Sequence, residues 1–215
     1  MLLHEMSAIL LCMAVFYMSD THFSHPLVSG LRGFRSLEEH DETIFNNIHK
    51  QVRTGDTLWI LGDVVFGSSK REMLERLRYE TIGVTMNVIL GNHDRPSPVM
   101  SNGHNFLQEW TDMFDFVGTY ARVSPGWMLS HYPYDTRYVK EQHRDYDETL
   151  EDRFDQYRVR DCGRPLIHGH THNPQKYSLS NSGTPQVNVC LEAWDMRPVS
   201  HGQIVNLLAS KGGSW

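Results

Sequence analysis

Five short apolar runs in this chain each end in a cluster of acidic, amide or imidazole side chains, and this recurrence constrains the fold more than any other feature. The runs and their clusters, in chain order, are AVFYM before SDTH, TLWIL before GDV, TMNVIL before GNHD, GWMLS before HYP, and PLI before HGHTH. Helix-like segments separate the first three runs: Ser36 and Glu39 have the spacing of a capping box, and residues 69–77 form a shorter candidate. Strands that alternate with helices predict an α/β architecture, in which ligands gather where the strands end.

The second half of the chain has a different rhythm. Apolar, β-rich runs follow one another with little helix between them, at residues 116–123, 126–130, 165–167 and 185–193. This spacing predicts a second, mostly antiparallel set of strands. Residues 199–210 predict a closing helix that ends at Lys211 and Gly212.

Length and charge narrow the classes of protein that the chain can represent. It has 215 residues, and no repeat or linker divides it, so we expect a single domain over residues 1–215. The formal net charge of −6 argues against stable binding to nucleic acid or to an anionic membrane, since both depend on clustered lysine and arginine. The expected partner is therefore a small molecule, and the residues leave the oligomeric state open.

Two features bear on the compartment. The apolar residues 7–18 resemble a signal-peptide core in length, but no Lys or Arg precedes them, no small-residue cleavage site follows, and they are too short to span a membrane. We therefore interpret this stretch as a buried first strand. The three cysteines lack CxxC spacing, which predicts reduced thiols and a cytoplasmic protein.

The polar clusters combine into one candidate metal site. Residues two apart in an extended chain point the same way, so the pairs Asp20/His22 and His168/His170 each offer two ligands to one side. Mixed imidazole and carboxylate donors suit Mn, Fe, Co, Ni or Zn, and the lack of thiolate ligands argues against a structural zinc site. Each pair alone is a weak signal. Five clusters in this order, each at the end of an apolar run, are hard to attribute to chance.

This ordered set, which reads DxH, GD, GNHD, H and GHxH, resembles the motifs of the calcineurin-like metallophosphoesterases between Asp20 and His170. The resemblance implies an α/β fold, α+β in some schemes, built as a four-layer sandwich of two mixed β-sheets flanked by helices. It also implies a dinuclear centre in which Asp63 bridges two divalent cations. The implied ligands of one cation are Asp20, His22, Asp63 and His170, and those of the other are Asp63, Asn92, His131 and His168.

The same resemblance gives the GNHD motif a role in substrate binding. Asn92 and His93 would contact the phosphate, and His93, which has no metal role, would protonate the leaving oxygen. Arg95 is a further candidate for phosphate contact, although an exposed structural arginine fits it equally well. The acidic partner of His93 is not identified, because GDVVFG lacks the second acid of the protein phosphatase motif GDxxDRG. Asp94 stands where the common motif GNHE carries glutamate.

The predicted activity is hydrolysis of phosphodiesters, such as 2′,3′-cyclic nucleotides or similar small diesters, by attack of a metal-bound hydroxide. The expected cofactors are two divalent transition-metal ions, Mn²⁺ first, with Fe, Zn, Ni and Co as alternatives. A phosphomonoesterase fits the same residues. A non-catalytic binding module is disfavoured, because all seven ligands and His93 are present. The HxHxDH signature of metallo-β-lactamase-like enzymes is not met, because Asn173 stands where its last histidine would.

The remaining histidines and one charged segment carry weaker signals. Residues 135–161 mix acids, bases and aromatic residues, which favours a solvated helical excursion over a cap that presents tyrosines to a substrate. His172 lies beyond the motif, so we expect it to support the ligands or to lie on the surface. No role is predicted for His25, His40, His49, His104, His143 and His201.

Overall fold

The computed structural model describes residues 13–67, 70–135 and 154–213. The first half of this part of the chain contains β1 Val15–Met18, α1 Pro26–Leu31, α2 Leu37–Gln51, β2 Thr57–Ile60, α3 Lys70–Glu80, β3 Thr85–Ile89, η1 Gly103–Phe106, α4 Leu107–Thr111 and β4 Phe116–Gly118. The second half contains β5 Tyr120–Val123, β6 Trp127–Ser130, η2 Asp155–Tyr157, β7 Leu166–His168, β8 Tyr177–Leu179, β9 Pro185–Asn188, η3 Leu191–Trp194, β10 Val199–Ser200 and α6 His201–Ser210. Short 3₁₀ helices are labelled η.

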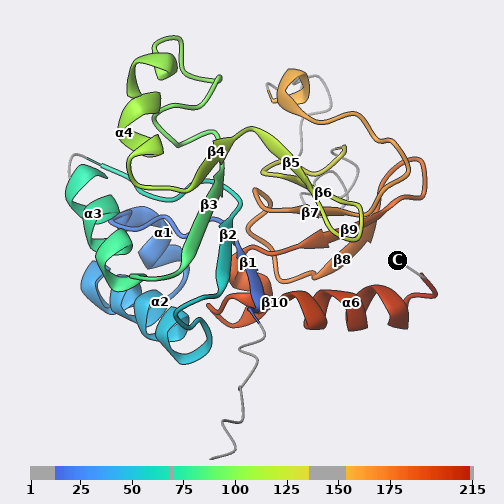
Figure 1. Ribbon diagram of the computed structural model, residues 1–215, viewed down its shortest axis with the longest axis horizontal. Coiled ribbons are helices and arrows are strands. Elements are labelled where there is room, and N and C mark those ends of the chain that lie inside the picture. The colour runs from blue at the N-terminus through green and yellow to red at the C-terminus, as the bar shows by residue number, and fades with distance from the viewer. Residues whose placement is uncertain (1–12, 68–69, 136–153, 214–215) are drawn as a thin grey trace, which may run out of the picture.

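The strands form two mixed β-sheets flanked by helices, which confirms the predicted fold (Figure 1). The first sheet has the order β10-β1-β2-β3-β4, in which β1 to β4 run parallel and β10 runs antiparallel to β1. Helices α2 and α3 lie in the connections between its parallel strands, as the alternation of strands and helices predicts. The parallel strands therefore end at one common edge.

The second sheet has the order β5-β6-β7-β9-β8. Its outer pairs, β5 with β6 and β8 with β9, are antiparallel, whereas β6 with β7 and β7 with β9 are parallel. The expectation of a mostly antiparallel set is therefore wrong. The connection from Ser130 to Leu166 is long enough to carry the chain back to the starting end of the sheet, and such a crossover makes the next strand parallel.

Two predicted strands are shorter than expected because the chain changes partner within them. Residues 116–123 divide at Thr119: β4 pairs with β3 of the first sheet, and β5 pairs with β6 of the second. Residues 185–193 leave the sheet after Asn188, bridge to Ser19 at Cys190, and then form η3. In both places a continuous apolar pattern conceals a change of neighbour.

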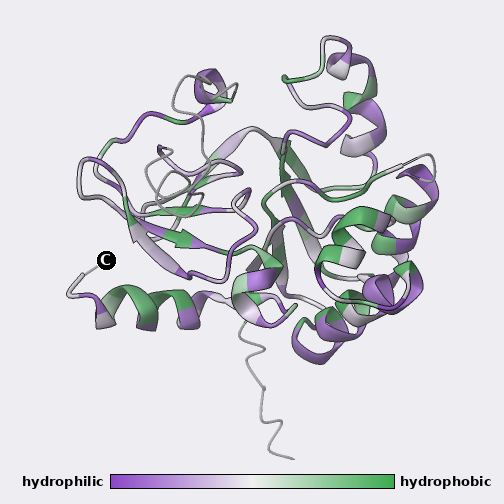
Figure 2. Ribbon diagram, turned by 180° about the vertical axis from the view of Figure 1, so that it is seen from behind, coloured by the Kyte–Doolittle hydropathy of each residue, from purple (hydrophilic) through white to green (hydrophobic). Residues whose placement is uncertain are grey.

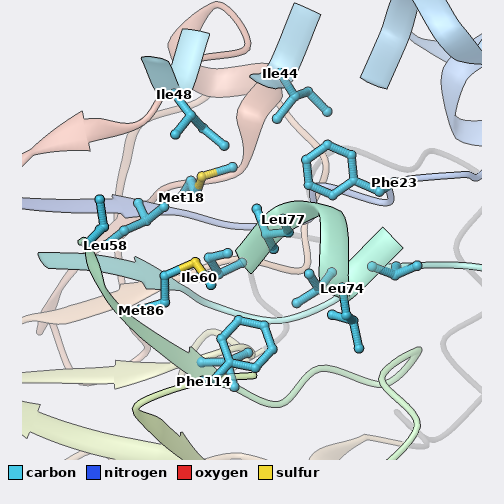
Figure 3. Close-up of a cluster of buried hydrophobic side chains, with 14 of the residues drawn as sticks. Met18, Phe23, Ile44, Ile48, Leu58, Ile60, Leu74, Leu77, Met86 and Phe114 are labelled. Atoms are coloured by element: carbon cyan, nitrogen blue, oxygen red, sulfur yellow. The ribbon is translucent and has the colours of Figure 1, made fainter. Parts of the chain in front are cut away.

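Alternation along the strands divides the core in two. Phe16 and Met18 of β1 join a cluster between the first sheet and helices α2 and α3, where Ile44 of α2 and Leu77 of α3 also lie (Figure 3). Tyr17, between them in β1, belongs to a second cluster with residues of β6, β7, β9 and α6. Figure 2 shows apolar colours on the central strands and both apolar and polar colours along the helices. The first sheet is thus buried on both faces, which is typical of parallel strands.

Helix ends follow the sequence signals in part. The Ser36 side chain accepts from the Glu39 amide at 3.0 Å, but the Glu39 carboxylate accepts from the amide of Arg35, so the predicted capping box is only half formed. The box is complete at α6, where Ser200 and Gln203 cap each other, and the predicted closing helix accordingly begins at His201.

The N-terminal prediction is confirmed where the structure describes it. Val15–Met18 form β1, a central strand, whereas residues 7–12 lie outside the described residues. Within the part of the chain that the structure describes, no helix is long and apolar enough to cross a membrane.

Candidate metal centre

The predicted ligands lie where strands of both sheets end. Asp20, Asp63 and Asn92 follow the parallel strands β1, β2 and β3, so these side chains reach the same edge of the first sheet. His131 follows β6, and His168 is the last residue of β7, its parallel neighbour in the second sheet. The two edges meet, as the contacts below show.

The ligand loops have an unusual backbone. Asp20, His22, Asp63, His170 and His172 have φ of 57°, 44°, 54°, 72° and 48°, in the left-handed region that non-glycine residues seldom adopt. The extended chain expected for the two histidine-containing pairs is therefore wrong, because β1 ends at Met18 and β7 at His168. Such backbone strain persists only where the surrounding structure enforces it, and it clusters at functional sites.

Asp63 lies at the centre of the site. Its Oδ2 is 3.6 Å from His22 Nε2 and 3.6 Å from His131 Nε2, and its Oδ1 accepts a hydrogen bond from the amide of His93 at 2.8 Å. Gly91 allows this approach, since a Cβ there would overlap Asp63 Oδ1. Burial raises the pKa of the Asp63 carboxyl to about 7, although His131 opposes that shift.

Asp20, His22 and His172 form one group of donor atoms that all lie within 4.8 Å of one another. His172 Nε2 is 3.1 Å from His22 Nε2 and 3.3 Å from Asp20 Oδ1. His172 is exposed, as one of the two expectations for it allowed, and it also belongs to a group of donor atoms that could hold a metal ion. The sequence contains a pattern that indicates His172. Residues 169–172 read GHTH and so match the GHxH motif with His170 and His172, whereas the predicted pair is His168 and His170.

Asp20, Asp63 and His131 form a second such group. The Nδ1 of His131 must donate to the carbonyl of Leu61, 2.7 Å away, so its Nε2 presents a lone pair to the site. That Nε2 is 3.1 Å from Asn92 Oδ1 and 3.2 Å from His170 Nδ1. Lone pairs that converge in this way are the arrangement that a cation stabilises.

His168 is placed differently from the other predicted ligands. Its Nδ1 donates to the carbonyl of Gly169 at 2.9 Å, and burial lowers the pKa of the ring to about 4. It belongs to neither donor group found among the described residues. Its assignment as a ligand stays a prediction.

A hydrogen-bonded network that the sequence did not predict supports the first group. The Nδ1 of His172 contacts Glu192 Oε1 at 2.7 Å, and the same oxygen accepts from Arg32 Nε at 2.9 Å. The Arg32 guanidinium also donates to the backbone carbonyl of Asp20 and lies 2.9 Å from His40 Nε2. Cys190 Sγ donates to Asp20 Oδ2 at 3.1 Å. His40, for which no role was predicted, is thus part of the support of the site, and so is Cys190.

Protonation in this cluster is uneven. Burial lowers the pKa of His22 to about 2. Burial also acts to lower the pKa of His172, but the carboxylates of Asp20 and Glu192 outweigh it and raise that pKa to about 10. In the metal-free cluster His172 therefore holds a proton at neutral pH.

The GNHD motif contributes His93 and a structural carboxylate. The His93 ring lies 5.4 Å from the His22 ring and 6.4 Å from the His25 ring, measured between centroids, and His25 stacks on Phe66 at 3.8 Å. His25, for which no role was predicted, is thus a neighbour of the site. Asp94 accepts from the amides of Asp63, Val64 and Gly91, so its carboxylate fastens the two loops together.

The other singled-out residues lie outside the cluster. The Arg95 guanidinium lies over the Phe106 ring at 3.9 Å, and its role in substrate binding stays a prediction. His201 stacks on Trp127, and His49 pairs with Glu80. His104 lies in η1, and His143 is outside the described residues.

The donor set fits divalent cations. The buried Oδ1 of Asp20 accepts no hydrogen bond and has the imidazole of His172 3.3 Å away, and a buried acceptor of this kind is costly unless an ion or water satisfies it. The two donor groups share Asp20 and combine carboxylate oxygen with imidazole nitrogen, the ligands that first-row transition metals accept.

Comparison with known proteins gives the family. The model of the calcineurin-like phosphoesterases matches residues 13–196. The Gene 66 protein of Mycobacterium phage L5 is 34% identical over 203 residues, which cover 89% of this chain and 92% of the phage protein. Uncharacterized protein MJ1445 of Methanocaldococcus jannaschii is 28% identical over 206 residues, 90% of each chain. The crystal structure of AQ665 from Aquifex aeolicus, a protein of unknown function, matches with a TM-score of 0.58 at 25% identity over 90% of this chain and 98% of that one. The chain belongs to the calcineurin-like phosphoesterase family, whose members are metal-dependent hydrolases of phosphate esters.

Proposed function

We propose that this chain hydrolyses phosphodiesters at a centre that holds two divalent cations, Mn²⁺ by preference. The observation that carries the proposal is the position of Asp63 Oδ2, 3.6 Å from the Nε2 atoms of both His22 and His131, with further donors on either side. The residues that would hold one cation are Asp20, His22, Asp63 and His172, and those for the other are Asp63, Asn92, His131 and His170. A pair of bound cations activates water and stabilises charge on phosphoryl oxygens.

Within this assignment His93 supplies the proton. Its backbone is fixed by the hydrogen bond to Asp63 Oδ1, and its ring lies beside His22, so it can reach the leaving oxygen of a phosphate held at the centre. Burial and the neighbouring imidazoles of His25 and His131 lower the pKa of the His93 ring. A lower pKa makes the imidazolium a stronger acid toward a departing alkoxide.

The surroundings favour a diester over a monoester. A cavity of about 390 Å³ opens beside His93, and no Lys or Arg is among the described residues that line it. A monoester dianion gains from additional cationic groups, whereas a diester carries one negative charge and a second organic group that needs space.

The expected compartment is the cytoplasm. The thiol of Cys190, which donates to Asp20, fits the reducing conditions there.

Metal analysis and paired substrates test the proposal. Purified protein loaded with Mn²⁺ should retain about two equivalents of metal and should cleave bis(p-nitrophenyl) phosphate faster than p-nitrophenyl phosphate. Faster cleavage of the monoester would contradict the assignment as a phosphodiesterase and would support the alternative assignment as a phosphomonoesterase. No cleavage of either ester with Mn, Fe, Co, Ni or Zn would overturn the proposed activity.

A further inference from the structure

The cavity beside His93 adjoins the proposed reaction centre directly. The described residues that line it are Asn92, His93, Val99, Met100, Phe154, Gln156 and Tyr157. A larger cavity of about 450 Å³ shares Gln156 and Tyr157, but none of the predicted ligands lines it. Only the smaller of these two is lined by residues proposed to contact the phosphate, Asn92 and His93.

The aromatic wall of this cavity is fixed against the metal centre. The Phe154 ring lies 5.3 Å from the His170 ring in an edge-on arrangement, and it stacks on Tyr132 at 5.5 Å. Tyr132 in turn lies edge-on to both His131 and His170, at 4.9 Å. Phe154, which directly precedes η2 at the end of the charged segment, thus contacts the site. In the described part of that segment Phe154 contacts the site, whereas η2 contains no buried residue, as the interpretation of a solvated helical excursion expects.

We infer that this cavity binds the leaving group of the ester and that this group carries an aromatic ring. The inference rests on the proposed function, since the side of the phosphate that faces His93 is the side that receives a proton. The described lining residues are apolar or uncharged apart from the imidazole of His93, so an ionic group would gain nothing there. A flat ring instead gains face or edge contacts with Phe154 and Tyr157. Met100, 37% exposed, adds a deformable apolar surface.

Hydrolysis of benzyl methyl phosphate tests which group leaves. Water adds its oxygen to phosphorus, the bond from phosphorus to one ester oxygen breaks, and that oxygen takes a proton. The inference expects benzyl alcohol and methyl phosphate as products. Release of methanol and benzyl phosphate would overturn the assignment of the cavity to the leaving group.

Binding of phosphonates tests the aromatic preference without any chemical step. In calorimetric titrations of the Mn²⁺-loaded protein, benzylphosphonate should bind on the order of 2- to 10-fold more tightly than cyclohexylmethylphosphonate. The ratio should fall to about one in Phe154→Leu and should persist in Tyr79→Leu, which changes an exposed tyrosine of α3. If Phe154→Leu folds poorly, the same ratio of affinities is measured in Tyr157→Leu, where it should also fall.

The two assays separate the inference from the proposed function. A ratio near one in the unaltered protein, or an unchanged ratio in both Phe154→Leu and Tyr157→Leu, would refute the aromatic subsite even if diesters are hydrolysed. A clear benzyl preference in binding, without hydrolysis of any ester, would support the subsite and count against the proposed activity.

Discussion

The Nε2 of His172 lies 3.3 Å from the Oδ1 of Asp20, although one residue follows β7 of the second sheet and the other follows β1 of the first. The loops come this close because Gly169 has no side chain. A Cβ at that position would overlap Ser19 Oγ and would lie 2.5 Å from Asp20 Oδ2. This contact joins the two sheets at the candidate metal centre and is the reason that His172 is proposed as a ligand.

Replacing His172 or His168 by asparagine distinguishes the two possible histidine pairs. Asparagine keeps a donor near the position of Nδ1 and removes Nε2, so each variant tests only the nitrogen in question. Loss of a residue that only hydrogen-bonds to a ligand weakens metal binding about 10- to 100-fold. His172→Asn removes a proposed ligand and should weaken Mn²⁺ binding by more than that. His168→Asn should leave affinity and stoichiometry unchanged, as measured by calorimetry. The opposite pattern would restore the pair expected from the sequence.

Asp63→Asn should abolish the binding of both cations and the turnover together. The carboxylate stands 3.6 Å from an imidazole nitrogen on either side, and an amide offers one neutral oxygen in place of a shared charge. Asp112→Asn is a suitable control, because that carboxylate lies on the exposed surface and contacts Gln108. Elemental analysis should show the loss of metal, and a variant that kept both equivalents would contradict the bridging role.

The sequence predicted the candidate ligands at the strand ends better than it predicted the residues that hydrogen-bond to those ligands. Apolar runs that end in Asp20, Asp63, Asn92 and His131 are local patterns, and a parallel sheet brings such ends together by its topology alone. Whether His168 or His172 lies near Asp20 depends on the path of the backbone after β7. The backbone at His170 and His172 is left-handed, and the sequence pattern gave no indication of this.

The residues that support the ligands had no local signal in the sequence. Arg32, Glu192 and Cys190 come from an α1 terminus and from the η3 region, and only tertiary packing brings them to the site. A split strand is equally hidden, since the change of partner at Thr119 leaves the apolar pattern of residues 116–123 intact.

Glu192→Gln should weaken metal binding without removing a ligand. The carboxylate of Glu192 receives the Nδ1 proton of His172, which orients the ring and makes its Nε2 a better donor. We expect affinity for Mn²⁺ to fall about 10- to 100-fold while stoichiometry is retained at saturation. Glu38→Gln, an exposed position in the first turn of α2, should behave as the unaltered protein in the same titration. An unchanged affinity in Glu192→Gln would show that the contact is only structural.

Metal affinity should rise with pH, because metal binding displaces one proton from Asp63 and one from His172. In the metal-free protein the pKa of Asp63 is raised to about 7 and that of His172 to about 10, so both ligands hold protons below those values. Each proton that a cation must displace weakens apparent binding about tenfold per pH unit below the pKa. Affinity should therefore increase about tenfold per unit from pH 7 to 9 and more steeply below pH 7. His172→Asn should flatten the upper part of this curve, and a flat curve in the unaltered protein would contradict the assignment.

His93→Ala should separate catalysis from metal binding. The His93 ring is absent from both donor groups in the described chain, so the variant should retain both equivalents of Mn²⁺. Loss of a general acid slows an ester with a poor leaving group by about 10²–10⁴-fold, whereas a good leaving group needs little protonation. We therefore expect a large decrease in kcat for benzyl methyl phosphate and a much smaller one for bis(p-nitrophenyl) phosphate. Equal decreases for both esters would indicate that His93 positions the phosphate and does not protonate the leaving oxygen.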